Sequence, residues 1–314
     1  MEKNKFMNSI KIFCPASVAN VSCGFDVLGF CLDGIGDEMK ITKIANKGLI
    51  ISKITGAELP LDPNKNVATI AASAILKNFN LDYGFDFEIK KNIKPGSGIG
   101  SSAASAVGAV YGINKLIGEP FEKKELIKFA LEGEKYASKA EHADNIAPAL
   151  LGGFSLVRCN KTFDIIKLPY PEKLYTTILH PEIELKTSHA RSILKKAIPL
   201  NDVVRQSGNL AALISALYTE NYDLISKSLK DYIIEPYRSK LIPEFDLLKK
   251  TALNSGALGS GISGSGPSIF ALSKGKEIAE NVGQEMKKIV SKLPIKHNVY
   301  VSKINQKGVK IIWQ

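Results

Sequence analysis

Two periods of hydrophobic and polar residues run through this chain, and together they predict a mixture of strands and helices. Residues 85–90 place Phe85, Phe87 and Ile89 on one face and charged side chains on the other, which is the pattern of a half-buried strand. Residues 101–117 are small and apolar, which favours a buried helix. We expect the chain to be organised around the glycine-rich stretch between these two segments.

The same reasoning predicts the other elements. The polar start of residues 142–153 favours an Asx-type turn in a loop, and the polar segment 158–164 favours a change of lobe between domains 1–160 and 161–314. The last two strands are expected to complete an α+β lobe. Turns are expected at Pro15, Asn20, Gly24, Gly29 and Gly48; strands at 10–14, 39–54, 154–157, 174–180, 297–303 and 309–313; and helices at 67–79, 121–140, 201–218, 222–229, 242–254 and 276–293.

The glycine-rich stretch, residues 95–104, reads PGSGIGSSAA. Glycines let a backbone approach a ligand closely, and the free N–H groups at a helix start attract anions, so the stretch favours a phosphate site. The Lys of a Walker A loop and the third Gly of a Rossmann fingerprint are both absent from it. A glycine turn into a tightly packed helix remains the alternative, although Ser101 and Ser102 add hydroxyls suited to phosphate or Mg²⁺.

Composition narrows the class of protein. The chain has 314 residues, 45% of them hydrophobic, which suits two domains, and its apolar runs are shorter than the roughly 18 residues of a membrane span. We therefore expect a cytoplasmic protein without a membrane partner. The four cysteines lack metal-ligand spacing and are expected to be reduced, and the net charge of +11 is scattered, which argues against nucleic acid as a partner.

Arginine is used sparingly. Only four of the 42 basic residues are Arg, so an Arg in this chain can mark a place that needs a planar fork for a carboxylate or phosphate. For any one of them, a surface salt bridge is an equally good explanation.

Five stretches together resemble the GHMP small-molecule kinases and, among them, the homoserine kinase family. They are residues 15–26 (PASVANVSCGFD), 95–104, 142–148 (HADNIAP), 235–243 (EPYRSKLIP) and 261–267 (GISGSGP). The resemblance implies an α+β, two-lobed GHMP kinase fold, with a ribosomal-S5-like N-terminal lobe and a ferredoxin-like C-terminal lobe. It also implies ATP, Mg²⁺ and L-homoserine as ligands, phosphorylation of the homoserine hydroxyl in threonine biosynthesis, and assembly as a homodimer.

The resemblance assigns the nucleotide end of the site. It implies that Glu134 and a serine of the loop, Ser102 or else Ser101, hold Mg²⁺, whereas most helix carboxylates taken alone are merely solvated. Asn66 lies where a helix cap belongs, and capping is its simpler explanation. The implied ATP-binding residues are Asn66, Val67, Lys91, Pro95, Gly96, Ser97, Gly98, Ile99, Gly100, Ser101 and Ser102.

The resemblance also assigns the substrate end. It implies that Asp26 receives the amino group of the substrate and that Arg191 and Arg238 grip its carboxylate. Ser22 and Cys23 replace a more usual Gly-Pro pair, which is a departure from the family pattern. The residues implied at the reacting hydroxyl are Asn20, His142 and Asn145.

The resemblance places Asn145 where other GHMP kinases have an Asp that acts as the base toward the substrate hydroxyl. Phosphoryl transfer passes through a loose transition state, so positioning and charge can supply most of the acceleration. We therefore expect the hydroxyl proton to leave late, without a strong base. A kinase acting on mevalonate or a sugar, and a nucleotide-binding module without chemistry, remain alternatives.

Overall fold

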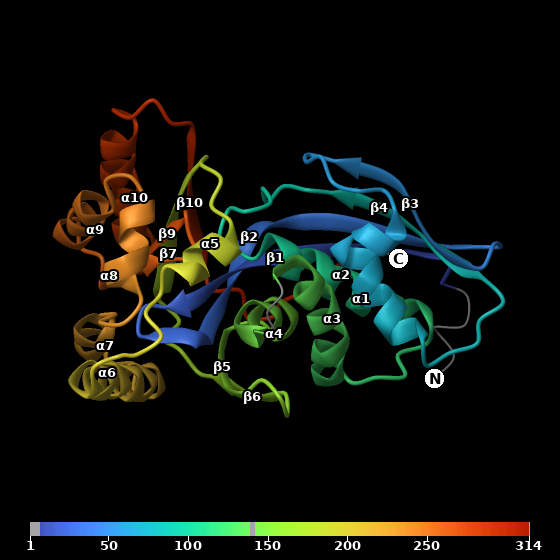
Figure 1. Cartoon of the computed structure of the whole chain (residues 1–314), viewed down its shortest axis with the longest axis horizontal. Coiled ribbons are helices and arrows are strands. Elements are labelled where there is room, and N and C mark those ends of the chain that lie inside the picture. The colour runs from blue at the N-terminus through green and yellow to red at the C-terminus, as the bar shows by residue number, and fades with distance from the viewer. Residues whose placement is uncertain (1–6, 139–141, 314) are drawn as a thin grey trace.

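Two β-sheets form the framework of the protein (Figure 1). The computed structural model describes residues 7–138 and 142–313. The larger sheet has the order β11-β1-β2-β4-β3, with β5 paired to β2 and β6 to β5; the smaller has the order β10-β7-β9-β8. The strands are β1 Ser9–Val21, β2 Gly24–Ile44, β3 Gly48–Thr55, β4 Gly84–Lys90, β5 Phe154–Cys159, β6 Asp164–Leu168, β7 Leu174–Pro181, β8 Gly259–Ile262, β9 Ile269–Lys274, β10 His297–Lys303 and β11 Lys310–Trp313.

The first two strands form one long antiparallel hairpin. The chain turns at Ser22 and Cys23, between the turns predicted at Asn20 and Gly24, which themselves end β1 and begin β2. The predicted breaks at Pro15 and Gly29 are wrong because both residues lie well inside strands. The pairing of β1 with β2 shifts register just after Pro15, and such an irregularity accommodates a residue that has no N–H to donate.

Four helices cover one face of the larger sheet, where α2 packs on β1 and β2 (Figure 1). Helix α2 is buried along nearly its whole length, as its small, apolar composition predicts. Helix α3 begins later than predicted, after the short 3-10 turn Lys123–Glu125, and the predicted end at residue 140 lies outside the described residues. The four helices are α1 Val67–Leu76, α2 Ser101–Leu116, α3 Leu126–Ser138 and α4 Ala143–Leu151.

Helix α4 replaces the loop expected at residues 142–153. His142 is its N-cap residue, and Asp144 places a negative side chain in the first turn, where the helix dipole favours it. Pro148 lies inside the helix and removes one backbone hydrogen bond. The prediction of a loop gave too much weight to the polar residues and to this proline.

Helices α9 and α10 pack against one face of the smaller sheet (Figure 1). Helix α10 is amphipathic, and Ala279, Val282, Met286 and Val290 form its buried stripe. The helices of this half are α5 Thr187–Ser192, α6 Leu200–Tyr218, α7 Tyr222–Ser228, α8 Glu235–Arg238, α9 Phe245–Asn254 and α10 Lys276–Val290.

One hydrophobic cluster spans both sheets, and a second lies between the smaller sheet and helices α9 and α10. The ring of Phe30 in β2 lies 4.9 Å from that of Phe154 and 6.1 Å from that of Phe270 in β9, measured between centroids. Strands β6 and β11 both belong to the larger sheet, so a division at residue 160 does not coincide with the division between the sheets. The expectation that the last strand completes the second lobe is wrong, since β11 pairs with β1.

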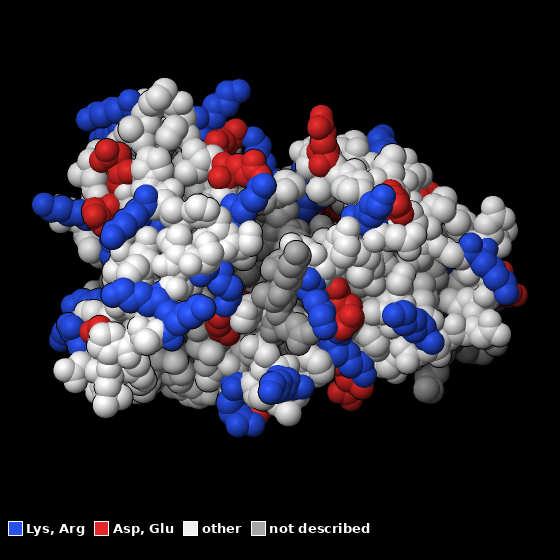
Figure 2. Space-filling view, in the orientation of Figure 1, with Lys and Arg blue, Asp and Glu red and all other residues white. Residues whose placement is uncertain are grey.

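The surface carries charge without one dominant patch on the face drawn in Figure 2, where Lys and Arg are interspersed with Asp and Glu. Among the described residues, no helix combines the length and the apolar character needed to cross a bilayer.

Candidate active site

A cleft of about 320 Å³ lies where the motif residues converge. Ile99 is the one predicted site residue that does not line it; its side chain is buried in the core, and its carbonyl accepts a hydrogen bond from the Ser17 amide. Residues of the lining that the sequence did not single out include Leu59 and Pro60. The predicted residues that line the cleft are Asn20, Asp26, Asn66, Val67, Lys91, Pro95, Gly96, Ser97, Gly98, Gly100, Ser101, Ser102, Glu134, His142, Asn145, Arg191 and Arg238.

Three glycines shape the loop between β4 and α2. Gly96, Gly98 and Gly100 all have positive φ angles, between 71° and 82°, which side chains disfavour. A Cβ atom on Gly98 would lie 2.5 Å from the carbonyl oxygen of Gly266, and one on Gly100 would collide with the Ser17 hydroxyl. Gly96 faces open space. The loop therefore needs glycine for its conformation and, at two positions, for close contact with other segments.

Helix α2 presents its amino end to this loop. Gly100 is its N-cap and provides no side-chain hydrogen bond, so the first N–H groups are available to an anion. Ser101 donates its hydroxyl to the Ile93 carbonyl, 3.0 Å away. The buried Ser97 hydroxyl has no hydrogen-bond partner within residues 7–138 and 142–313. Ser97 and the helix amides thus offer donors to a phosphate.

The second glycine-rich segment braces the first. The Ser263 hydroxyl donates to the Gly98 carbonyl at 2.8 Å, and the Ser268 hydroxyl donates to the Ser97 carbonyl at 2.6 Å. Both serines belong to residues 259–268, next to β8 and β9. These contacts fix the loop conformation from a segment more than 160 residues away in the chain.

Lys91 serves the framework of the loop. Its ammonium forms an ion pair with the buried Asp37 and donates to the Ser101 carbonyl and the Ser105 hydroxyl, both at 3.0 Å. Three donors are all that an ammonium has, so these contacts occupy Lys91 fully. Asp37 also accepts from the backbone amides of residues 92 and 93, which ties β2 to the start of the loop. Sequence reasoning missed Asp37, because nothing near it in the chain marks it as a partner of Lys91.

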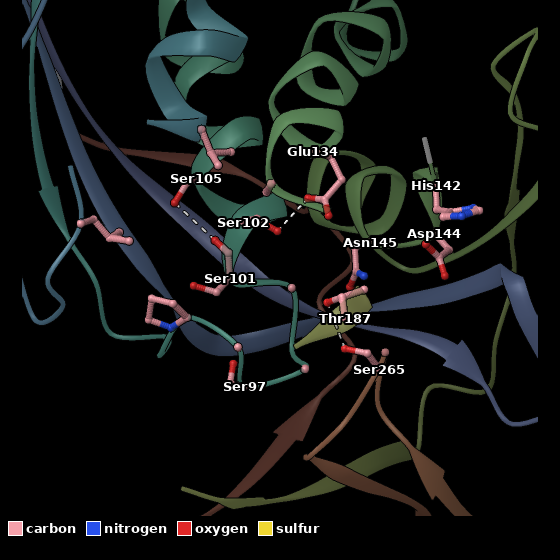
Figure 3. A pocket seen from close by; sticks show the side chains of 18 of the residues that line it. Ser97, Ser101, Ser102, Ser105, Glu134, His142, Asp144, Asn145, Thr187 and Ser265 are labelled. Carbon is pink, nitrogen blue, oxygen red and sulfur yellow. Dashed lines mark hydrogen bonds between the residues drawn. The ribbon is translucent and has the colours of Figure 1, made fainter. Parts of the chain in front are cut away.

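Ser102 and Glu134 face each other across the neighbouring helices α2 and α3 (Figure 3). The Ser102 hydroxyl donates to the Glu134 carboxylate at 2.7 Å. Mg²⁺ in kinases typically takes one or two protein oxygens and completes its shell with phosphate and water. The donor pair beside the glycine-rich loop fits that requirement, and among the described residues no group of three or more His, Cys, Asp or Glu side chains forms a fuller metal site.

Asn66 caps α1. Its side-chain oxygen accepts from the Ala68 amide at 3.0 Å, and its side-chain nitrogen donates to the Pro60 carbonyl at 2.9 Å. Leu59, Pro60 and Val67 line the cleft with it and add apolar surface of the kind that an aromatic ring can lie against.

The turn between β1 and β2 holds two predicted substrate residues in strained conformations. Asn20, Ser22 and Asp26 have φ angles of 56°, 49° and 58°, which are uncommon outside glycine. The Asn20 side chain accepts from the Asp26 amide at 2.8 Å and donates to the Gly264 carbonyl at 2.7 Å. The turn is therefore fastened both to itself and to the glycine-rich segment before β9.

Asn145 has a defined orientation at the centre of the cleft. Its side-chain oxygen accepts from the Ser17 hydroxyl at 2.8 Å, which leaves the amide N–H₂ as the group available to a ligand. A group so arranged donates hydrogen bonds and does not accept protons. Ser17 is fully buried in β1, and sequence reasoning missed it.

Asp144 is a second feature that the predictions missed. Its carboxyl group is 3% exposed and lines the cleft next to Asn145 (Figure 3). Burial and, after it, the nearby carboxylates of Asp26 and Glu134 raise the pKa of Asp144 to about 7, although hydrogen bonds from the backbone amides of Asp144 and Asn20 act in the opposite direction. The group therefore titrates near neutral pH.

The two predicted arginines lie together beside Asp26. Arg191 makes a two-pronged contact with Asp26, with nitrogen–oxygen distances of 2.9 and 3.1 Å, and His142 Nε2 lies 3.7 Å from the same carboxylate. Arg238 is 2% exposed and donates to the carbonyls of Ala190 and Gly264. Burial, followed by the charge of Arg191, lowers the pKa of Arg238 to about 10, so it stays charged at neutral pH.

Comparisons with known proteins place this chain in a family. The family model for the N-terminal domain of GHMP kinases matches residues 66–153, and the model for their C-terminal domain matches residues 213–292. The homoserine kinase of Chlorobium phaeobacteroides (strain DSM 266) is 44% identical over 98% of this chain and all of its own length. A crystal structure of homoserine kinase from Cytophaga hutchinsonii is 49% identical and superposes with a TM-score of 0.96 over 99% of this chain and all of the other.

More distant structures share the fold alone. Mevalonate kinase of L. major, solved with R-mevalonate, gives a TM-score of 0.72 at 15% identity over 96% of this chain and 98% of its own. The two family models, the full-length identity and the shared fold lead to one conclusion: this chain belongs to the homoserine kinase family of the GHMP kinases.

Proposed function

We propose that this kinase transfers the γ-phosphoryl group of ATP to the side-chain hydroxyl of L-homoserine and yields O-phospho-L-homoserine for threonine biosynthesis. One observation carries the proposal. A single cleft is lined both by the glycine-rich loop at the start of α2 and by two guanidinium groups beside a carboxylate. An α-amino acid with a terminal hydroxyl has the charges to pair with the second group of residues and the alcohol to reach the loop.

The ends of the cleft divide the work of binding. The loop glycines, Ser97 and the amino end of α2 receive the phosphates, and Leu59, Pro60 and Val67 lie against the base. Arg191 and Arg238 receive the substrate carboxylate in the forked geometry that guanidinium groups favour, and Asp26 receives the ammonium. Ser102 and Glu134 would hold Mg²⁺, which offsets negative charge on the phosphates when bound.

Positioning carries the chemistry in this proposal. Asn145 donates its amide N–H to the reacting end of the substrate, because Ser17 already occupies its oxygen. Asn20 and His142 line the same part of the cleft and restrict where the hydroxyl can lie. When binding holds the two reactants in line, the entropy cost of bringing them together is met before the reaction step. In phosphoryl transfer through a loose transition state, positioning and electrostatic stabilisation supply most of the acceleration.

A coupled assay of ADP release tests the substrate directly. L-homoserine, L-serine, mevalonate and galactose are each supplied with ATP and Mg²⁺, and we expect turnover with homoserine at least tenfold above the others. Turnover of mevalonate or galactose in preference to homoserine would replace the substrate assignment. An absence of ADP release with every alcohol, while ATP still binds, would favour a nucleotide-binding module without chemistry.

Assembly as a homodimer is a separate part of the proposal and does not depend on the site. Light scattering of the purified chain gives its mass directly, and a mass of one 34.1 kDa chain at micromolar concentration would refute the dimer.

A further inference from the structure

The substrate-holding groups of this site are paired with each other. Arg191 and Asp26, proposed to bind opposite charges of the amino acid, form a two-pronged ion pair with three nitrogen–oxygen distances between 2.9 and 3.2 Å. Both are partly buried, with side chains 39% and 21% exposed. An amino acid that uses both groups has to break this pair, or share it, before it can bind.

Arg238 is arranged differently. Its guanidinium donates to two backbone carbonyls, and no carboxylate of the described residues lies within salt-bridge distance of it. Burial lowers the pKa of Arg238, and the nearby positive charge of Arg191 lowers it further. A ligand carboxylate near both arginines would therefore relieve their mutual repulsion, which Asp26 now offsets mainly for Arg191.

Phe25 connects the two arginines. The guanidinium carbon of Arg238 lies 5.0 Å from the centre of the Phe25 ring, and that of Arg191 lies 5.5 Å from it. Both distances are within the range of cation–π attraction. The ring is a shared support that keeps two like charges close enough for one carboxylate to touch both. Phe25 directly precedes Asp26 in the strained turn, so the same backbone fixes the support and the carboxylate.

From this arrangement we infer that the site selects its substrate by exchanging ion pairs: the substrate carboxylate takes Arg191 from Asp26, and the substrate ammonium takes the place of Arg191 on Asp26, while Phe25 positions both arginines. The inference rests on the proposed function. A zwitterionic ligand replaces the one ion pair within the protein with two ion pairs between ligand and protein. A ligand with one charge breaks the internal pair and leaves either Asp26 or Arg191 without its arginine or carboxylate partner, and the loss of such a partner from a partly buried charge is costly.

The exchange makes a quantitative prediction that independent subsites do not make. Four alcohols form a square: L-homoserine has both charges, 3-aminopropan-1-ol has the ammonium, 4-hydroxybutyrate has the carboxylate, and propan-1-ol has neither. If the charges bind independently, the product of kcat/KM for homoserine and propan-1-ol equals the product for the two singly charged alcohols. Under exchange, the first product exceeds the second by at least tenfold.

The square is measured by coupled ADP release with the full chain, ATP and Mg²⁺. The same four alcohols are then measured with the Asp26→Asn, Arg191→Gln double variant, which lacks the internal ion pair. In this variant we expect the two products of kcat/KM values to agree within threefold. Equal products in the unaltered protein would overturn the exchange while homoserine turnover still upheld the proposed function. An excess that persisted in the double variant would also overturn it, because the coupling would then come from the ligands.

Phe25 has its own test. Phe25→Leu removes the aromatic face, and we expect KM for homoserine to rise about tenfold with KM for ATP unchanged; Phe25→Tyr keeps the face and should restore KM to within twofold. A rise in both KM values, or a failure of Phe25→Tyr to restore KM, would assign Phe25 to packing alone. A crystal structure with homoserine in which Arg191 still holds both oxygens of Asp26 would refute the exchange outright.

Discussion

The two ends of the cleft are built in different ways. The end proposed to bind phosphate consists mainly of backbone: glycines with positive φ, helix N–H groups and carbonyls held by Ser263 and Ser268. The end proposed to bind the amino acid consists of charged side chains from β2, α5 and α8, which meet only in the fold. The first end is fixed in place before a ligand arrives, whereas the second is closed on itself by an ion pair. Preorganised backbone suits ATP, and side-chain pairs suit discrimination between small alcohols.

Breaking the phosphate end should have the largest effect. In Gly98→Ala, the new Cβ would lie 2.5 Å from the Gly266 carbonyl oxygen at a φ of 82°, so the loop has to move. A displacement of about 1 Å in the reacting groups costs roughly 100-fold. We expect kcat to fall by about 100-fold or more and KM for ATP to rise, with homoserine binding intact by calorimetry.

Gly118→Ala is the matched control for this prediction. Gly118 has a φ of 95°, but a Cβ added there would meet no atom within 4 Å, so the substitution shares the backbone strain without the collision. A loss of activity in Gly118→Ala equal to that in Gly98→Ala would mean that general destabilisation, and not the loop contact, explains the effect.

A substitution at the proposed amino-acid end should have a nearly equal effect, and it should weaken the use of homoserine and not that of ATP. Arg238→Lys keeps the charge but cannot contact Ala190, Gly264 and a carboxylate in the same fork. Losing a partner from a buried charge cluster typically costs about 2 kcal/mol or more, which is about 30-fold. We expect KM for homoserine to rise by that factor while KM for ATP stays within twofold. Arg205→Lys, at an exposed arginine that stacks on Tyr232, is the control and should change neither.

The difference between the ends also explains what the sequence could predict. Local patterns sufficed for β4, α2, the loop between them and the Asn66 cap, because glycine spacing, helix-start hydroxyls and period-two alternation act over a few residues. Ser17 and Asp37 carry no local mark, and their importance comes from partners more than 50 residues away. The roles of Arg191 and Arg238 were available only through resemblance to a family. Helix α4 was missed since local polarity outweighed the buried apolar side of the segment.

The metal pair lies between the two ends and should give a smaller effect. Glu134→Gln keeps an oxygen near Ser102 but removes the charge, so we expect kcat at limiting Mg²⁺ to fall roughly tenfold and to recover partly as Mg²⁺ is raised. Glu132→Gln, at an exposed carboxylate on the same helix, is the control. Titration of activity with Mg²⁺ checks the prediction; an identical Mg²⁺ dependence in both variants would remove Glu134 from the metal site.

Asp144→Asn should change the free energy of unfolding least at low pH, and the change should grow as the pH rises. Its pKa is raised in the folded protein from 3.8 to about 7, so between these values the folded protein holds a proton that the unfolded chain has released. Its contribution to stability is therefore greatest below about pH 4 and decreases as pH rises toward 7. Asp144→Asn removes this dependence, and we expect the variant to gain up to a few kcal/mol relative to the unaltered protein between about pH 4.5 and pH 7.5. Urea unfolding at both pH values measures the difference; a gain that does not increase with pH would mean that Asp144 is ionised in the fold and finds its stabilisation in the amides of Asn20 and Asp144 itself.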